Sequence, residues 1–528
     1  MLPSPPLILA ASSLARADVL VLCAYFALLI GTGIWFSRRK VRDTRDYFLA
    51  NRSMPAWAVS LSILATAQSA ATFVGVPQSS YLGDLTYLSS NIGGVIAGFI
   101  LAWIFIPAYY RLGITTPYAL LETRFGPHAR TGASWAYLVG RVFASGARVF
   151  VGSLPACEAI FGDITAPNLC ITIVIFMIFG ILYTFVGGIS SAIWTDVIQV
   201  CVYLGAAVVA LVLLYSRIPG DASTIVHALS HPPPPEASKL IVISWSTDLS
   251  KEFTVFTVTT GFVLLTLASH GMDQDLVQRM LTCKNAGQGA KSVLGGVLIG
   301  IPTVILFLTL GLLLSIFYKR PDIMGSAAPD YAVGTFAFQT FAFREMQGGL
   351  AGLFLAGLFA AGPAGINSGL NSMSSTFVTD LYRRRYRTNT EAHYLRVGRL
   401  AVIVSGLAIG GFAMACIALY NPKQNTLIGF VLSVMNFAYA GLLGMFLIAL
   451  FTRRGTQASA LWALATGFAV VFLLQPSIWK VWTNLTPWLQ EHVNPIQLAF
   501  PWHLVLGATA ACLVCASKTR PPASTRPS

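Results

Sequence analysis

At residues 54–83 the chain reads MPAWAVSLSILATAQSAATFVGVPQSSYLG. This stretch is apolar and long enough to cross a bilayer, for which roughly 20 residues suffice. Pro77 lacks a backbone N–H and its ring clashes with the preceding turn, so the pattern predicts a helix that bends or breaks at Gly75-Val76-Pro77. Carbonyls freed at that depth must be buried in protein or line a wet cavity. The stretch therefore fits either a proline-kinked span or a site for Na+ or a polar solute. Polar residues lie in its middle: Thr66, Gln68, Ser69 and Thr72.

Composition places the whole chain in a membrane. Of its 528 residues, 55% are hydrophobic and only 10% are charged, which is typical of a polytopic helical membrane protein. Its apolar runs are continuous over about 20 residues, whereas the strands of a membrane barrel alternate with a period of two. The formal charge of +14 is concentrated in loops, so it indicates orientation in a bilayer and no nucleic-acid partner.

Signals for catalysis are lacking in the sequence. It has no GxxxxGK phosphate loop, no HExxH and no GxSxG, so we predict that the protein is not an enzyme. Its eight cysteines form no CxxC pair, and we interpret them as small buried hydrophobic residues. No Lys or Arg precedes the short apolar stretch at the amino end, so the first span is expected to act as its own signal.

Hydropathy predicts about thirteen transmembrane helices in one transporter domain, residues 1–528. Most of the 34 Lys and Arg residues follow odd-numbered spans, which predicts N-out and C-in by the positive-inside rule. The spans are expected at 18–37, 54–79, 87–110, 131–159, 168–187, 190–216, 252–270, 291–318, 348–379, 394–420, 425–451, 457–475 and 501–517.

The spans divide into a leading helix (18–37), five helices (54–216), five more (252–451) and two additional helices (457–517). Five is odd, so a second unit of five would be an inverted copy of the first. Transporters with inverted repeats carry their binding site at the midplane, between units whose first helices are broken. We therefore expect the seventh span to be the partner of the second.

Several spans carry charged or polar side chains. Asp196 lies about two turns inside the sixth span, which suits either an interfacial helix cap or a cation ligand. Arg141 is expected to extend its side chain toward the cytoplasmic surface, and Arg148, deeper in the same span, to meet a substrate carboxylate or a buried one such as Asp196. Asp273, Asp275, Gln278 and Arg279 fit a short amphipathic helix with a solvated surface.

Five motifs make the chain recognisable. It resembles the sodium/solute symporter family, which implies a LeuT-type 5+5 inverted repeat and alternating-access transport. The motifs are SAATFVGVPQSSY (Ser69–Tyr81), TPYALLETRFG (Thr116–Gly126), TFVGGISSAIWTDVIQV (Thr184–Val200), GMDQDLVQRMLTCKNAGQGAKS (Gly271–Ser292) and NSGLNSMSSTFVTDLYRR (Asn367–Arg384).

The resemblance also implies ion sites. A first Na+ site would use the carbonyls of Ala65, Gln68 and Ala361, with hydroxyls at positions 364 and 365. Here those positions are Ala364 and Gly365, so two ligands are missing. A second site would combine Asp196, Asn367 and Ser368.

Three coupling modes stay open at this point. The ion is Na+ at a weakened or displaced site with Gln68, Asn367 or water supplying oxygens, or a proton on Asp196, or coupling is lost in a carrier or a solute sensor. We expect Na+ as the coupling ion and no organic cofactor. A sensor would carry a signalling domain after the last span, and only 11 residues follow Ser517.

The solute is expected to be a sugar, a sialic acid-like molecule or another small organic acid. The other expected partner is the lipid bilayer, of a cell (inner) membrane that the chain crosses many times, with a monomer as the functional unit. Tyr81 and Tyr87 are predicted gate residues. The predicted substrate cavity is lined by Thr66, Ser69, Thr72, Gln78, Asn91 and Arg148.

Overall fold

The computed structural model describes residues 15–37, 44–186, 188–234, 237–329, 336–387, 390–420, 426–475 and 498–518. Within these ranges the extended secondary structure is helical, and the only bridge of β type joins Met54 and Cys283.

The first half of the chain gives the helices that precede and follow the quoted stretch. They are α1 (Arg16–Ser37), α2 (Thr44–Leu49), η1 (Ala50–Arg52), α3 (Ala56–Ala67), α4 (Ala70–Leu82), η2 (Thr86–Ser89), α5 (Ser90–Ile100), the π-helical η3 (Leu101–Phe105), α6 (Ile106–Leu112), α7 (Tyr118–Phe125), α8 (Pro127–Phe161), α9 (Ala166–Val186), α10 (Ile189–Arg217) and α11 (Ala222–Ser230).

The second half continues in the same way. Its helices are α12 (Val255–Thr257), the π-helical η4 (Val258–Phe262), α13 (Val263–Gly271), α14 (Gln274–Met280), α15 (Ala286–Lys319), α16 (Pro321–Met324), η5 (Gly325–Ala327), α17 (Ala337–Arg344), α18 (Leu350–Thr376), the π-helical η6 (Phe377–Tyr382), α19 (Arg383–Arg385), α20 (Glu391–Leu419), α21 (Leu427–Phe451), α22 (Gln457–Leu473) and α25 (Phe500–Ala516).

Each of the thirteen predicted spans falls on one of these helices or on a consecutive set of them. By length and composition, five described helices are able to cross a membrane, or up to nine if each bent pair counts as one span. The predicted fold class, a helical protein with several apolar helices able to cross a membrane, is therefore confirmed. The number of crossings and the orientation stay predictions.

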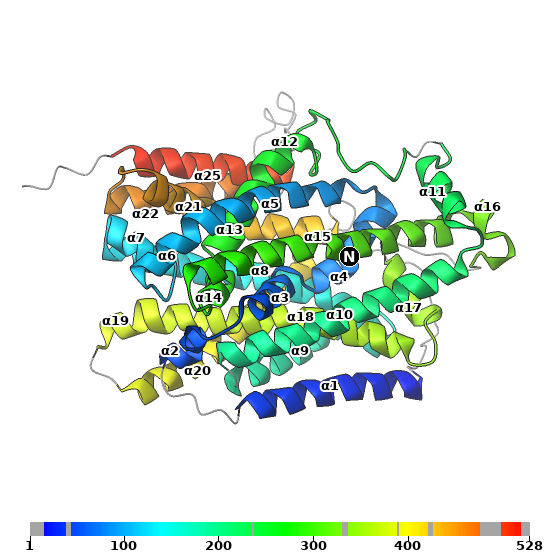
Figure 1. Cartoon of the computed structure of the whole chain (residues 1–528), viewed down its shortest axis with the longest axis horizontal. Helices are drawn as coiled ribbons and strands as arrows, with labels where there is room; N and C mark the ends of the chain where they lie inside the picture. Colours follow the sequence, from blue (N-terminus) through cyan, green and yellow to red (C-terminus); the bar gives the residue numbers. More distant parts are fainter. Residues whose placement is uncertain are drawn as a thin grey trace, which may run out of the picture.

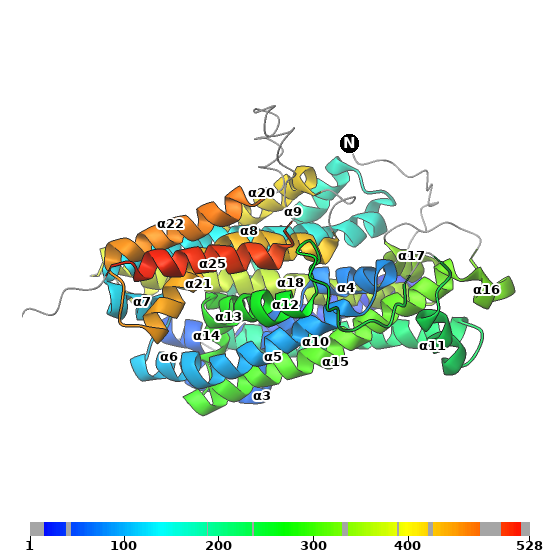
Figure 2. The ribbon, with the colours of Figure 1, turned by 90° about the horizontal axis from the view of Figure 1, so that it is seen from above.

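The long helices run side by side along the longest axis of the molecule (Figure 1). We call the end that carries α7 and α19, with Arg383, Arg384 and Arg385, the basic end, and the end that carries α11 and α16 the opposite end. Seen from above, α21, α22 and α25 form one flank, while α15 lies along α3, α4, α5 and α10 on the other (Figure 2).

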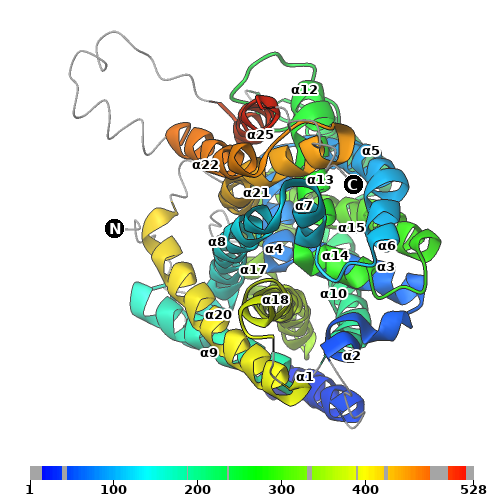
Figure 3. The same ribbon diagram turned by 90° about the vertical axis from the view of Figure 1, so that its left-hand side faces the viewer.

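Helix α18 lies inside the bundle. It packs against α1, α8, α9, α10 and α20, and the view along the bundle shows it enclosed by them (Figure 3). Helix α18 also touches α3, α4 and α14, so it contacts the helices on both sides of the first chain break described next and the helix that follows the second.

Two helices of the bundle are broken at similar angles. The axis turns by 65° between α3 and α4, and by 64° between α13 and α14. The prediction of a broken second span is confirmed. The other break lies between Gly271 and Gln274, just after the predicted seventh span, 252–270. The inverted repeat itself stays a prediction.

The position predicted for the first break was wrong. The helix breaks at Gln68 and Ser69, whose backbones are extended, and α4 continues through Pro77. Close packing holds α4 there: a Cβ at Gly311 of α15 would lie 2.1 Å from the Pro77 carbonyl oxygen, and the Ser80 hydroxyl donates to the Leu308 carbonyl at 2.8 Å. Packing of α4 against Gly311 therefore keeps the helix continuous where Pro77 alone was expected to break it.

Candidate functional site

The first break is stabilised by side chains that the sequence placed in a substrate cavity. Ser69 and Thr72 form a capping box that starts α4, with the Ser69 N–H donating to the Thr72 hydroxyl oxygen at 3.3 Å. Thr66 donates its hydroxyl to the Ser62 carbonyl at 2.8 Å. Because these hydroxyls bond to the backbone, they supply an alternative to helical hydrogen bonds at this point.

Carbonyls at this break are left without helical partners. Arg148 of α8 donates to the Thr66 carbonyl at 3.2 Å, whereas no group in the described ranges donates to the carbonyls of Ala65 or Gln68. Ala65, Gln68 and Ala361 line one small cavity together with Gln199 of α10. The structure thus brings together three of the five residues predicted for the first Na+ site.

The other two residues of that predicted site are Ala364 and Gly365. The side chain of Ala364 lies outside the described part of the structure. Gly365 lines a second cavity with Ser69, Ser145 and Arg148, and a Cβ added at Gly365 would meet nothing within 4 Å. A β-carbon at position 365 would therefore meet no steric obstacle.

Arg148 faces this second cavity without a counter-ion. Among the described residues no carboxylate forms an ion pair with it, and its two hydrogen bonds go to the Thr66 carbonyl and, at 3.5 Å, to the Met435 sulfur. The pairing with Asp196 that the sequence left open does not occur. The hydroxyl of Ser145, in the same cavity, is buried and has no hydrogen-bond partner in the described structure.

The three residues of the predicted second ion site each have a different partner. Asp196 accepts from the Ser62 hydroxyl and, at 3.0 Å, from Arg279. Asn367 accepts from the Thr184 hydroxyl at 3.2 Å, and Ser368 donates to the Asp275 carboxylate. No hydrogen bond joins any two of the three in the described ranges, so this site stays a prediction without support from the contacts.

The helix after the second break is buried, which corrects the expectation of a solvated surface. Asp275 and Gln278 of α14 have no exposed area, and Arg279 is 1% exposed. Helix α14 packs between α3 and α18, so its polar residues face protein. Their hydrogen bonds are to buried groups, for example from Gln278 to the Phe48 carbonyl at 2.7 Å.

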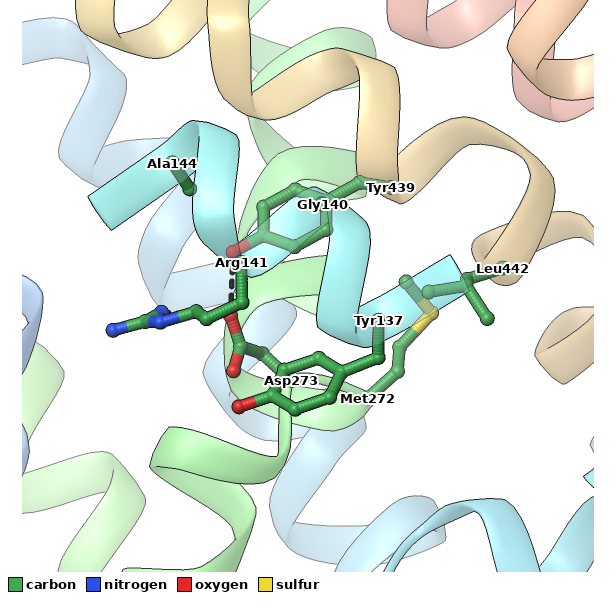
Figure 4. A pocket seen from close by; sticks show the side chains of 8 residues that line it. All are labelled: Tyr137, Gly140, Arg141, Ala144, Met272, Asp273, Tyr439 and Leu442. Carbon is green, nitrogen blue, oxygen red and sulfur yellow. Dashed lines mark hydrogen bonds and ion pairs between the residues drawn. The ribbon is translucent and has the colours of Figure 1, made fainter. Parts of the chain in front are cut away.

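Arg141 is likewise buried, at 4% exposed. The prediction that its side chain extends to the cytoplasmic surface was therefore wrong. Arg141 forms ion pairs with Asp273, at 3.0 Å, and with Asp275. Tyr439 of α21 donates to Asp273 at 2.8 Å, and Figure 4 shows its hydroxyl directed at that carboxylate beside Arg141. Arg279 pairs with Asp275 and Asp196, both at 3.0 Å. We call these five charged residues the ion-pair network: Arg141, Asp196, Asp273, Asp275 and Arg279.

The carbonyls freed at the second break are bonded by tyrosines. Tyr109 donates to the Gly271 carbonyl, and Tyr118 to the Met272 carbonyl at 2.9 Å. Asp273 caps α14 by accepting from the Asp275 N–H at 3.0 Å. Backbone groups inside a membrane protein must be satisfied in this way when no water reaches them.

The remaining predicted cavity and gate residues lie toward the opposite end. The Gln78 amide oxygen accepts from the N–H of Leu427 at 3.2 Å, at the start of α21. Asn91 donates to the Leu88 carbonyl at 3.0 Å. The ring of Tyr81 lies under the Lys319 ammonium at 4.5 Å, and Tyr87 packs edge-on against Phe253. Their roles in a gate or a substrate cavity stay predictions.

Sequence reasoning missed Gln199 and the ion-pair network. Two arginines in one span were a signal, because each needs a counter-ion at that depth. The counter-ions of Arg141 are the carboxylates of the motif GMDQD, Asp273 and Asp275, which the sequence analysis assigned to a solvated surface. Gln199 lies about one helical turn after Asp196, but a single glutamine in an apolar span gives no indication of its partners.

Comparison with known proteins settles the family. Residues 47–467 match the model of the sodium:solute symporter family. The chain belongs to this family. It is 27% identical to the sodium/sialic acid symporter NanT of Aliivibrio fischeri, over 87% of this chain and 88% of that protein. It is 28% identical to the sodium/sialic acid symporter SiaT of Proteus mirabilis, over 83% and 86%.

Other relatives are named for other solutes. The human sodium/iodide cotransporter is 27% identical over 84% of this chain and 68% of its own length. Among solved structures, a substrate-bound, outward-open Na+-coupled sialic acid symporter superposes with a TM-score of 0.79 at 24% identity, covering 95% of this chain and 97% of that one. This likeness shows a shared transporter fold.

Family membership gives the general activity: this symporter couples Na+ to the transport of a small solute across a membrane. The Na+-coupled mode among the three alternatives left open by the sequence is therefore the one supported.

Proposed function

We propose that this symporter carries a small organic acid, of the size of a sugar acid or a sialic acid, with Arg148 binding the carboxylate of the solute. The observation that carries this proposal is the contrast among three arginines at membrane depth. Arg141 and Arg279 each pair with two carboxylates, whereas Arg148 has no ion pair in the described structure.

An unpaired guanidinium inside a membrane protein raises the free energy of the folded state. A solute carboxylate bound to Arg148 would therefore stabilise the guanidinium, and the guanidinium would stabilise the bound carboxylate. Guanidinium and carboxylate groups form two parallel charge-assisted hydrogen bonds. Ser69 and Ser145 lie in the same cavity and would supply hydroxyls for the polar remainder of the solute. The two relatives named as sodium/sialic acid symporters agree with this chemistry.

Arg148 also connects the solute to the ion. Its hydrogen bond to the Thr66 carbonyl places positive charge beside the residues that line the Gln199 cavity. A carboxylate on Arg148 would neutralise this charge, so that Na+ and solute each favour binding of the other, as linkage requires. We further propose that the basic end faces the cytoplasm, by the positive-inside rule, and that one chain is a complete transport unit in a cell membrane.

The test is uptake by proteoliposomes under an inward Na+ gradient, with N-acetylneuraminate, gluconate and glucose as solutes. We expect uptake of an acid, and a loss of about 10- to 100-fold in Arg148→Gln, because a hydrogen bond to a charged group contributes about 1.5–3 kcal/mol. Ser223→Ala, at an exposed position of helix α11, is the control. Na+-driven uptake of glucose alone, unaffected by Arg148→Gln, would contradict the proposal.

A further inference from the structure

A groove lies on the flank of the bundle where α22 packs against α8 and α21 (Figure 3). Its volume is about 390 Å³, within the range of pockets that hold a small molecule, about 300–1,000 Å³. Every residue that lines it is hydrophobic or a glycine. We call it the lateral groove, and its lining includes Ala136, Val139, Phe143, Phe437, Leu461 and Phe468.

The lateral groove is open to the outside of the bundle. Trp135 and Val139 of α8 are 52% and 49% exposed, and Phe468 of α22 is 44% exposed. In a bilayer such side chains contact lipid tails, which are as apolar as leucine. Along α8 the groove extends over residues 132–143, roughly 17 Å at 1.5 Å per residue. It therefore has the shape and the polarity to hold an acyl chain.

One end of the lateral groove lies close to the basic end of the bundle. Helix α8 begins at Pro127 and α22 at Gln457. Gly132 and Leu461 are the first residues of these helices that line the groove, about one turn further along. The two helix starts are adjacent, since a Cβ at Gly126 would lie 2.6 Å from the Gln457 amide oxygen. A lipid in the groove would therefore have its headgroup beside the loops that precede α8 and α22.

Four cations gather at these loops. Arg453 and Arg454 precede α22 and are exposed, as is Lys518 after α25. The backbone holds Lys518 beside them, because its carbonyl accepts from the Gly455 N–H at 2.9 Å. Arg124 of α7 donates to the Arg454 carbonyl at 3.2 Å. We call Arg124, Arg453, Arg454 and Lys518 the cation cluster.

The cation cluster has no counter-ion among the described residues. None of its four members forms an ion pair there, and Glu122, which lies two residues before Arg124, pairs with Arg130 and Arg384. Guanidinium groups bind phosphate through paired hydrogen bonds, and basic clusters beside membrane helices attract anionic lipids. The cluster therefore suits the phosphate of a lipid whose chain lies in the groove.

We propose that the lateral groove binds an acyl chain of an anionic phospholipid, with the phosphate at the cation cluster. The groove shares two lining residues, Gly140 and Leu442, with the cavity beside Arg141 and Asp273 (Figure 4). A bound chain would thus pack against α8 and α21 directly behind the ion-pair network. This lipid site goes beyond the transport activity and depends on neither the solute nor the ion.

The test is the thermal stability of the detergent-purified full chain in titrations with dioleoyl phosphatidylglycerol and, in parallel, with dioleoyl phosphatidylcholine. A lipid that binds only the folded protein raises its Tm in a concentration-dependent way. We expect the anionic lipid to act at a lower concentration than the zwitterionic one. Native mass spectrometry of the same samples shows whether lipid stays bound and whether the chain is a monomer.

The headgroup contact is tested by the double variant Arg453→Gln with Arg454→Gln. Its half-saturating concentration of phosphatidylglycerol should rise about tenfold or more, because each cation near the membrane surface adds to the attraction. The matched control is Arg385→Gln with Arg387→Gln, which removes two exposed arginines outside the cation cluster. This control should bind phosphatidylglycerol like the wild type.

The chain contact is tested by Ala465→Phe, which places a ring in the groove and should weaken the binding of both lipids. The control is Ala469→Phe, an exposed position one turn further along α22 that does not line the groove. If Ala465→Phe does not fold, the arginine variants still decide the proposal.

Equal responses of the wild type to the two lipids would overturn the proposal, as would equal losses in the two arginine double variants or in the two phenylalanine variants. A dimer without bound lipid in the mass spectrum would overturn it in favour of a second copy of this chain on the groove. The titrations contain no solute, so failure of the lipid site is distinct from failure of the solute proposal, which appears in uptake.

Discussion

The two broken helices bend by almost the same angle, 65° at Gln68 and 64° at Met272, yet their surroundings differ. At the second break, tyrosine hydroxyls bond the Gly271 and Met272 carbonyls. At the first, the Ala65 and Gln68 carbonyls accept no hydrogen bond from the described residues. The same interruption of a helix thus leaves hydrogen-bonded carbonyls at the second break and carbonyls without a hydrogen bond from the described residues at the first.

The charged side chains at the two breaks differ in the same way. The ion-pair network at the second break joins two guanidinium groups to three carboxylates, all buried. Beside the first break stands Arg148, without an ion pair in the described structure. The first break thus leaves backbone carbonyls and Arg148 available to a ligand, as the proposed function requires, whereas the ion pairs at the second break hold α14 against α3, α8 and α18.

The largest expected effect comes from breaking the network. Asp275 pairs with both Arg141 and Arg279, so Asp275→Asn leaves two buried cations without one counter-ion each. Removing one partner of a buried pair costs about 3–5 kcal/mol, and we expect a large drop in Tm and in folded yield. Glu391→Gln, at an exposed pair with Arg383, should cost less than about 1 kcal/mol. Equal Tm values for the two variants would contradict a structural role of the network.

A smaller loss of stability is expected when a tyrosine hydroxyl that makes a hydrogen bond is removed, and almost none when the hydroxyl makes no hydrogen bond. Tyr118→Phe removes the donor to the Met272 carbonyl and should cost about 1–3 kcal/mol. Tyr203→Phe removes a hydroxyl that has no partner in the described structure, and should change the stability in Na+-free buffer by less than about 0.5 kcal/mol. Chemical or thermal unfolding of both variants gives the answer. A larger loss in Tyr203→Phe would mean that the first break is also sealed.

The smallest effect on stability is expected at Gly365. A Cβ there meets nothing within 4 Å, and serine favours a helix over glycine by about 0.5 kcal/mol, so Gly365→Ser should be tolerated. We also expect it to bind Na+ about fivefold more tightly, because it restores one hydroxyl ligand worth about 1 kcal/mol. Gly369→Ser is the control: its Cβ would lie 3.0 Å from the Ser145 hydroxyl oxygen and 3.1 Å from the Arg141 guanidinium. Weaker Na+ binding in Gly365→Ser would contradict the prediction.

Much of the fold was predictable because a span of given length and hydropathy has few alternatives to a helix. Each of the thirteen expected segments falls on a described helix or a consecutive set of helices. The break was placed wrongly because the effect of Pro77 depends on Gly311, more than 200 residues away, and the capping box of Ser69 and Thr72 was the local signal to use instead.

The site was less predictable, because partners of buried polar groups depend on tertiary contacts. Ala65, Gln68 and Ala361 could be placed by resemblance, and they share a cavity. Helix α14 was expected to be solvated, since a short segment rich in charge has the same pattern whether water or other charges surround it. Its burial follows from Arg141 on α8 and Asp196 on α10, which no local pattern reveals.

The most direct test is hydrogen–deuterium exchange of the purified full chain in NaCl and in choline chloride, measured on peptides that cover residues 64–74 and 268–278. We predict that Na+ slows exchange at the first break, since an ion there orders its free carbonyls, and that the second break exchanges slowly in both salts. Protection by Na+ at the second break with none at the first would contradict the assignment of ligand site and structural joint.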